Sequence, residues 1–374
     1  MLTRLTALFR CSFMKAFCLL VTLLAAGCAS VGPKTIEPAR YGYNEAAVHS
    51  MNEQLLLNLV RLRYNEAPYF MQLGSIVTQY SAGISAGINP SINENGSPRT
   101  QWGVPIGAQY TEAPTITFNP MQDEDFARSL LSPIPSRTLM LLSHSGWSGD
   151  RLMLCCVQRL NDVQNIPIAS WPSKSDMPKY QRFEKLSDLF RDLQKEGLIE
   201  NKIVTHKDGS QQDYFYIYSD TSSSPETKET IVETKRLLGL SPEKNEYPIV
   251  PAYVHTTGDA LKMETRSLAG VLTFLSKAVQ APRSHIEEGR LTAEPEAFSL
   301  CDWKLEDGKL LTIYSCKEKP KFAYIKIYYR DHWFFVDDRD TSSKSTISLV
   351  NALFALQAAE TKGQGLLLTL PAAI

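Results

Sequence analysis

The sequence lacks an excess of charge of either sign. Its 374 residues include 39 lysines and arginines against 40 aspartates and glutamates, a formal net charge of -1 at pH 7. Proteins that bind nucleic acid usually carry a basic stripe or face, and this sequence has no Lys/Arg tract that would form one. We therefore expect no nucleic acid among the partners of this protein.

Signatures of metal and nucleotide binding are also missing. No CxxC or Cys/His spacing typical of zinc occurs, and there is no glycine-rich phosphate loop or dinucleotide fingerprint. The motif Gly146-Trp-Ser-Gly-Asp150 differs from the nucleophile elbow G-x-S-x-G, because aspartate stands at its last position. We expect Ser148 to lie in a turn between two helices, and we expect no cofactor. The histidines are scattered along the chain, at His49, His144, His206, His255, His285 and His332.

The densest polar cluster precedes a predicted helix that begins near Ser343. It lacks the spacing of an EF-hand calcium loop. Negative charge at a helix N-terminus is stabilising by about 0.3–1 kcal/mol, so helix capping explains this cluster better than a metal site does. The cluster consists of Asp331, His332, Asp337, Asp338 and Asp340.

Acidic residues are absent from the first 27 positions, which carry Arg4, Arg10 and Lys15. A second candidate start, Met14, precedes an apolar stretch from Ala16 to Gly27. This stretch is too short to span a bilayer and has the length of a signal-peptide core. We predict that residues 1-27 are a signal peptide.

The run Leu24-Ala-Ala-Gly-Cys28 resembles the lipobox of bacterial lipoproteins, although the family prefers leucine where Ala25 stands. The resemblance implies cleavage before Cys28 and acylation of that cysteine, for example with palmitate. Aspartate after the cysteine retains such lipoproteins in the inner membrane, and Ala29 stands there instead. The implied location is therefore the periplasmic face of the outer membrane, where several acyl chains give stable anchoring. An ordinary secretory signal is the alternative.

Hydrophobic periodicity predicts an α+β fold in three parts. Residues 28–40 would form an extended, lipidated tether, and residues 41–172 a helical domain with a long β-hairpin. Residues 173–374 would form an α+β domain with a mixed antiparallel sheet and helices. The predicted helices cover 44–64, 123–131, 136–144, 150–160, 179–196, 226–238 and 343–359, with one more capped by Thr265. The predicted strands cover 202–205, 214–218, 249–254, 260–263, 310–314, 322–329, 332–336 and 366–370; the third and fourth would form a hairpin around Gly258-Asp259.

Cysteines are few once the signal peptide is set aside. Cys301 and Cys316 flank the turn sequence Asp307-Gly308, so we predict that they form a disulfide across neighbouring strands. The adjacent pair Cys155 and Cys156 lies among apolar residues, and buried free thiols are expected there.

The clearest pattern is an alternation with a period of two over residues 75–111. Within the two arms, residues 76–88 and 102–111, apolar residues occupy most even positions, and small or polar residues occupy most odd ones. The two arms flank a segment that contains Asn95-Gly96, which predicts a long hairpin with one apolar face. This face comprises Ile76, Tyr80, Ile84, Ile88, Trp102, Val104, Ile106 and Tyr110.

Two interpretations of this hairpin stay open. A transmembrane β-strand needs about 9–11 alternating residues, and both arms are long enough. The open edges of one hairpin are not tolerated in lipid, so several subunits would have to contribute hairpins, and Pro105 removes one ladder donor. In the other interpretation, the apolar face packs on its own domain or on a partner.

Three short segments resemble a family of uncharacterised bacterial lipoproteins of the outer-membrane type. They are Asn58-Leu-Val-Arg-Leu-Arg-Tyr64 with Pro68, Thr265-Arg-Ser-Leu-Ala-Gly270 and Trp333-Phe-Phe-Val-Asp-Asp-Arg-Asp340. The resemblance implies anchoring in the cell envelope. It implies no known reaction and supplies no catalytic residues.

Together these observations favour a non-enzymatic, lipid-anchored envelope protein that binds or assembles with other components. Its expected partners are the membrane, through acylated Cys28, and envelope proteins or further copies of itself. The alternative is a subunit of an oligomeric outer-membrane pore formed through residues 75–111. A third hypothesis is a periplasmic hydrolase that uses distant residues such as His332 and Asp338.

Overall fold

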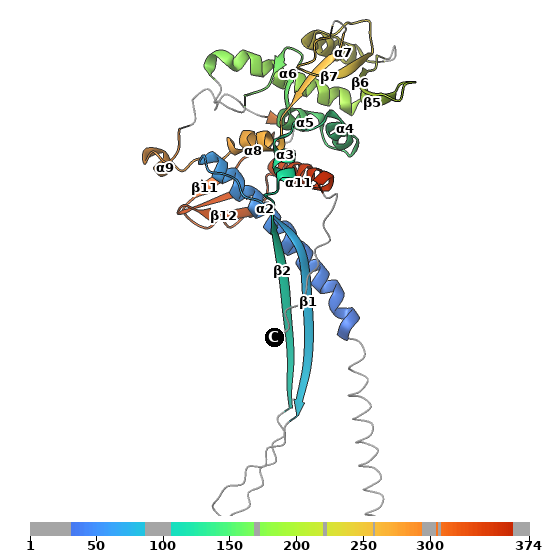
Figure 1. The fold of residues 1–374 in the computed structure, drawn as a ribbon. Coiled ribbons are helices and arrows are strands. Elements are labelled where there is room, and N and C mark those ends of the chain that lie inside the picture. Colours follow the sequence, from blue (N-terminus) through green and yellow to red (C-terminus); the bar gives the residue numbers. More distant parts are fainter. Residues whose placement is uncertain are drawn as a thin grey trace, which may run out of the picture. The chain divides into compact units, whose positions relative to one another are not determined.

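The computed structural model describes residues 31–86, 106–167, 173–219, 223–256, 259–293, 304–305 and 308–361. The chain forms two units, residues 1–53 and 54–374, and the second holds every sheet that the structure describes. Figure 1 labels the elements. Helices occur together with antiparallel and mixed sheets, so the predicted α+β class is confirmed.

Helix α2 runs from Val31 to Arg63 and contains the predicted helix 44–64 almost entirely. The predicted tether is therefore wrong over residues 31–40, which are helical rather than extended. Pro33 had suggested an extended chain, but it occupies the first helical turn, where the missing N–H breaks no intrahelical bond. Towards its C-terminal end α2 contributes Leu56 and Leu59 to the core, both fully buried.

A six-stranded sheet with the order β4-β3-β8-β7-β6-β5 is the largest in the molecule. Its strands are β3 (Val157–Leu160), β4 (Val163–Gln164), β5 (Ile199–Thr205), β6 (Gln211–Ile217), β7 (Glu246–Pro251) and β8 (Leu261–Thr265). The predicted domain boundary at residue 172 runs through this sheet, because β3 pairs with β8. Residues on both sides of the boundary thus share one sheet.

Two local predictions within this sheet are wrong. Strands β7 and β8 pair in parallel, with Ile249 opposite Leu261, and do not form a hairpin. The predicted turn residue Asp259 has another role: its carboxylate accepts the N–H of Ser241. This bond joins the segment between β7 and β8 to the loop after α7, so Asp259 does not form a tight turn. The predicted helix 150–160 ends at Cys156, and Val157, a β-branched residue, begins β3.

The helices of this unit begin with side-chain caps in several places. Asp123 accepts the N–H of Phe126 at the start of α3, and Ser224 caps α7 in the same way. Helix α8 is capped by Ser267, whereas the predicted cap Thr265 donates its hydroxyl to the carbonyl of Ile134. The helices are α3 (Glu124–Leu131), α4 (Ser136–His144), α5 (Gly149–Cys156), α6 (Met177–Lys195), α7 (Pro225–Leu238), α8 (Leu268–Ser276), α9 (Arg283–Glu287) and α11 (Thr341–Thr361); a short 3₁₀ turn, η2, spans Lys174–Asp176.

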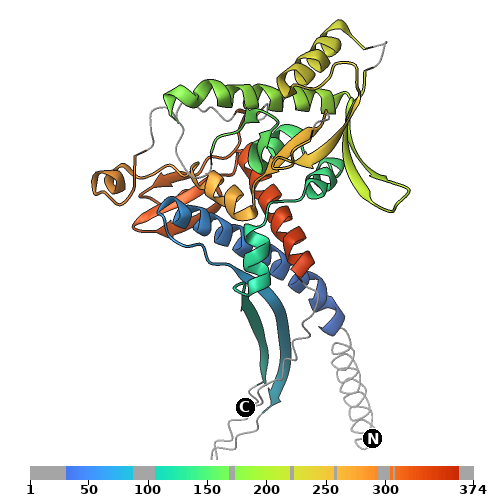
Figure 2. The same cartoon turned by 45° about the horizontal axis from the view of Figure 1, so that its top comes forward.

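A second, three-stranded sheet has the order β11-β13-β12 and is antiparallel. It consists of β11 (Tyr314–Cys316), β12 (Ala323–Tyr329) and β13 (His332–Asp337). The last two lie within one residue of the predicted strands, whereas the predicted strand 310–314 is misplaced and shares only Tyr314 with β11. Lys304–Leu305 (β9) and Gly308–Lys309 (β10) form a short separate pair. Helix α3 packs against both α8 and α11, as Figure 2 shows. The predicted strand 366–370 lies outside the described residues.

A buried arginine, which directly follows β8, links this strand to α5, β3 and α8. The guanidinium of Arg266, 1 % exposed, donates to the carbonyls of Leu154, Cys155 and Ile166 and stacks on the ring of Phe274 at 3.7 Å. Its remaining partner is the side-chain oxygen of Gln158. Burial lowers the pKa of Arg266 to about 9, so the group stays charged at neutral pH and is held by neutral acceptors alone.

Candidate functional site

The predicted hairpin is present as a two-stranded ribbon, β1 (Met71–Ala86) with β2 (Ile106–Pro120), paired antiparallel (Figure 1). We call this pair the ribbon. Among the predicted face residues, Ile76, Tyr80 and Ile84 belong to β1, and Ile106 and Tyr110 belong to β2. Ile88, Trp102 and Val104 lie outside the described residues. The ribbon is longer than predicted, because the alternation continues through Ile116 and Phe118.

The register keeps the two alternating patterns in phase. From Ser75 to Ala86 every even-numbered residue of β1 stands opposite an even-numbered residue of β2: Ile76 pairs with Ile116, Ala82 with Tyr110 and Ala86 with Ile106. Residues directly opposite each other in an antiparallel pair share one face of the sheet. The pairing is therefore the one that a single apolar face across both strands requires.

A β-bulge at Gly74 extends this phase to the base of the ribbon. The register shifts between Leu73 and Ser75, so that odd-numbered Leu73 stands opposite Phe118 and joins the face of Ile76 and Ile116. A Cβ atom at Gly74 would lie 2.7 Å from the side-chain nitrogen of Asn119, so a side chain there would require this amide to move.

The apolar side chains at the base of the ribbon are only partly covered. Ile116 is 46 % exposed and Phe118 49 %, while Ile76 is half-buried. Within the described part of the chain, β1 and β2 pair with no strand except each other, which leaves both outer edges open. Packing of this face on its own domain is thus incomplete where the structure describes it.

The ribbon has almost no charged residue. Its two strands contain neither lysine nor arginine, and Glu112, opposite Tyr80, is their one acidic residue. Soluble proteins usually protect open strand edges with charges, especially lysine, because an exposed edge pairs readily with other chains. Such protection is missing from this ribbon apart from Pro114 and Pro120, each of which withholds one donor from β2.

Side-chain amides of α2 anchor the start of β1. The amide of Asn58 donates to the carbonyl of Tyr69 at 2.8 Å and accepts its N–H at 2.9 Å. One helical turn earlier, Gln54 forms the same two bonds with Met71, at 3.0 and 2.8 Å. The strand end β2 joins this base, because Met121 N–H donates to the carbonyl of Phe70. We call this arrangement the amide clamp.

The amide clamp is a feature that the sequence did not predict. Asn58 is a polar residue, yet it is fully buried together with the apolar residues Leu55 and Leu59 of the same helix. A signal existed: two amides spaced by four residues on one helix have about the spacing of alternate residues in an extended chain. Gln54 and Asn58 could therefore have been matched to a neighbouring strand.

A buried aromatic and histidine cluster lies next to the clamp. The hydroxyl of Tyr64 is 2.5 Å from Nδ1 of His285, and the rings of His285 and His332 meet edge to face at 4.6 Å. Burial raises the pKa of Tyr64 to about 12. Burial, followed by the neighbouring His332, lowers the pKa of His285. Glu66 accepts hydrogen bonds from Tyr329 and Arg330 beside this cluster.

Of the predicted cluster before α11, Asp340 caps the helix as expected, whereas Asp331 lies in the turn before β13 and His332 is the first residue of β13. Asp340 accepts the N–H of Ser343 at 2.9 Å and its hydroxyl at 2.5 Å. Asp338 forms an ion pair with Lys344, and Asp337 accepts the N–H of Arg339. In the described residues no three His, Cys, Asp or Glu side chains are grouped so that they could hold a metal ion.

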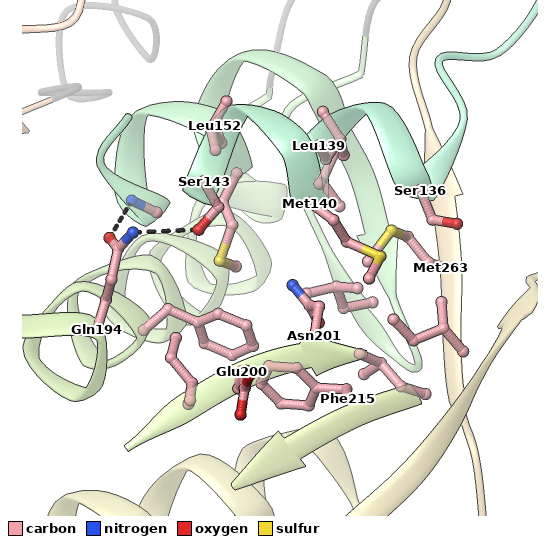
Figure 3. A pocket seen from close by; sticks show the side chains of 18 of the residues that line it. Ser136, Leu139, Met140, Ser143, Leu152, Gln194, Glu200, Asn201, Phe215 and Met263 are labelled. Carbon is pink, nitrogen blue, oxygen red and sulfur yellow. Dashed lines mark hydrogen bonds between the residues drawn. The ribbon is translucent and has the colours of Figure 1, made fainter. Parts of the chain in front are cut away.

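A small cavity of about 100 Å³ lies between helices α4, α5 and α6 and the six-stranded sheet (Figure 3). Its wall is largely apolar, with Leu139, Met140, Leu152, Phe215 and Met263 among the lining residues. The side-chain amide of Gln194, on α6, is among the polar groups that line the cavity. It accepts the N–H of Gly149 and donates to the hydroxyl of Ser143. An engineered cavity of about 150 Å³ binds benzene, so this one has room for a small apolar group at most.

The predicted turn and the two predicted free thiols are present in the structure. Ser148 precedes α5 at its N-cap position, between α4 and α5, as expected. Cys155 and Cys156 are buried free thiols, and burial raises the pKa of both. Cys316 is half-buried, and its sulfur contacts the carbonyl of Glu318. Cys28 and Cys301 lie outside the described residues, so the lipidation and the disulfide stay predictions.

No helix in the described part of the chain combines the length and the apolar character needed to cross a membrane. The resemblance to uncharacterised bacterial lipoproteins likewise stays a prediction. Comparison of the chain with protein-family models, with curated proteins and with solved structures finds no match in any of the three.

Proposed function

We propose that this protein is a lipid-anchored component of the cell envelope that acts by assembling with other proteins through the ribbon β1–β2. The observation that carries the proposal is a ribbon with two open edges, half-exposed apolar residues such as Ile116, and almost no charge. Such a surface is costly for a protein that works alone, because open uncharged edges invite pairing with other chains.

The amide clamp supports an assembly role. A two-stranded ribbon has little stability by itself in water, and this one is fixed at its base to a buried part of α2. Asn58 and Gln54 bind the backbone of Tyr69 and Met71 rather than their side chains. The clamp thus presents the ribbon in a defined position and, within β1, occupies the backbone groups of Met71, its first residue.

The test is membrane fractionation followed by size determination in mild detergent. Three forms of the full chain are compared: the unchanged protein, Cys28→Ala, and a form with residues 75–111 replaced by a short Gly/Ser loop. We expect Cys28→Ala to leave the membrane fraction and the ribbon replacement to lose its larger assemblies. A protein whose size is the same with and without residues 75–111 would contradict the assembly role.

A matched control separates assembly from folding. The exposed turn Lys207–Ser210 joins β5 and β6, a hairpin inside the six-stranded sheet. Replacing that turn by the same Gly/Ser loop should leave the size of the assembly unchanged. Circular dichroism of both replacements checks that the rest of the chain stays folded.

A second candidate function, a subunit of an oligomeric outer-membrane pore, is supported by one specific observation. The bulge at Gly74 keeps Leu73 in phase with Ile76, so the apolar pattern of β1 runs over a strand of 16 residues, Met71–Ala86. This exceeds the roughly 9–11 residues of a membrane-spanning strand. Release of a small dye from liposomes by the unchanged protein, and not by the form lacking residues 75–111, would favour the pore over a peripheral assembly.

A further inference from the structure

We propose that the partner of the ribbon is the ribbon of a second copy of this chain, joined head to tail. In this arrangement the outer edge of β1 in one copy pairs with the outer edge of β2 in the next. The inference rests on the proposed function, which gives the ribbon an assembly role, and it adds the identity of the partner and the geometry of the contact.

The topology of the ribbon makes it complementary to itself. Its two strands are antiparallel, so a neighbour that places its β1 beside β2 continues the same up-and-down order. Each copy offers one β1 edge and one β2 edge, so every joint uses a different edge from each partner. Contacts of this heterologous kind repeat from copy to copy and satisfy every inner edge.

The phase of the side-chain pattern favours another ribbon over an unrelated strand. One face carries Leu73, Ile76 and Ile116. On the opposite face Ser75 pairs with Thr117, and Val77 pairs with Thr115. A second copy, joined so that odd residues again stand opposite odd residues, continues both faces without a break. A shift by one residue would place apolar residues beside hydroxyls along the whole joint.

Charge and anchoring point to the same partner. The ribbon has no basic residue, and Glu112 is its one acidic residue, so nothing in it would recruit a charged partner. Pro114 and the terminal Pro120 each remove one donor from β2, and the other backbone groups of the strand keep theirs. Copies held at one membrane by the acylated Cys28 of the proposed function also meet at raised local concentration, which favours pairing between copies.

Cysteine cross-linking between differently tagged, co-expressed full-length copies tests this geometry. One copy carries Val77→Cys on β1, and the other carries Ala113→Cys, Thr115→Cys or Thr117→Cys on β2, all with Cys301→Ser and Cys316→Ser. Val77 is 49 % exposed, so its replacement disturbs little packing. We expect at least one of the three mixtures to yield, after mild oxidation, about ten times more disulfide-linked dimer than either variant alone.

The controls decide between outcomes. Ile116→Cys on the opposite face of β2 should give no cross-link to Val77→Cys, and a cross-link there would overturn the proposed phase. A strong dimer of Val77→Cys alone would show β1 beside β1, which contradicts the head-to-tail order. If no mixture gives a cross-link, the second copy is rejected as the partner. The assembly role would still stand if the larger species persisted and required residues 75–111. If the larger species did not require these residues, both the assembly role and the head-to-tail pairing would be rejected.

Discussion

The side chain of Asn58 binds the backbone of Tyr69 through both of its amide functions, at 2.8 and 2.9 Å, although the two residues belong to a helix and to the chain entering a strand. Gln54 repeats the arrangement with Met71 one turn earlier. The two amides take the place that a neighbouring strand would occupy in a sheet. They differ in burial, because Asn58 is fully buried and the bonds of Gln54 are exposed.

Asn58→Leu should lower the free energy of unfolding by about 1–3 kcal/mol, since both hydrogen bonds vanish at a buried position. Gln54→Leu removes the equivalent bonds where water can replace them, so the loss there should stay below about 1 kcal/mol. Urea denaturation followed by circular dichroism measures both. Equal losses in the two variants would show that burial does not determine the strength of the clamp.

The histidine cluster predicts a loss of stability in mild acid. The pKa of His285 lies below its usual value of 6.5 because of burial and the neighbouring His332, and Arg290 and Arg330 act in the same direction while Glu288 opposes them. The unfolded chain therefore binds a proton more readily than the folded one, and stability falls as the pH drops below about 6.5. Tyr64, whose hydroxyl meets His285, stays uncharged across this range.

Urea denaturation at pH 7.5 and at pH 5.5 measures this effect. His285→Gln should reduce the difference in unfolding free energy between the two pH values. The exposed His206 provides the control, because His206→Gln leaves the cluster intact. An unchanged pH dependence in His285→Gln would exclude this imidazole as its source.

Arg266 should be the most sensitive single position of the six-stranded sheet. Arg266→Met leaves the carbonyls of Leu154, Cys155 and Ile166 without their donor, and hydrogen bonds to charged groups contribute about 1.5–3 kcal/mol each. We expect the free energy of unfolding to fall by about 3 kcal/mol or more. Arg159→Met, which breaks a partly exposed ion pair with Glu264, should cost less than about 1 kcal/mol.

The two faces of the ribbon should respond differently to the same side chain. Ile116→Asn places an amide on the apolar face, and we expect the assembled fraction in mild detergent to fall about tenfold, equivalent to about 1.4 kcal/mol. Thr115→Asn, one residue away on the opposite face, should leave assembly unchanged. Size determination measures both variants, and equal effects would remove the distinction between the faces.

Local signals in the sequence predicted many elements well. Helix α4 has the predicted bounds, and Asp123 caps α3 through the bond to Phe126 that such a residue commonly makes. The hairpin followed from alternation alone, because a period of two is specific to strands. The second strand extends beyond the predicted end at Thr111, because the alternation continues through Ile116 and Phe118.

Features that depend on distant residues could not be predicted. Helix α5 ends at Cys156 because Val157 pairs with Thr265 in β8, more than a hundred positions away. Strands β7 and β8 pair in parallel, and the hydrogen bond from Ser241 to Asp259 holds the segment between them. No local sequence pattern predicts this bond. The clamp depends on the same kind of distant contact: the spacing of Gln54 and Asn58 fits a strand, but it does not indicate which strand supplies the backbone partners.

The shared phase of β1 and β2 limits how the ribbon can change in length. Inserting one residue into β1 between Ser75 and Ala86 would move every side chain beyond it to the other face, unless a new bulge absorbed the insertion as Gly74 does. Inserting two residues into each strand would only lengthen the ribbon and keep both faces intact. Homologous ribbons of different length should therefore differ in steps of two residues per strand, which can be counted in aligned sequences.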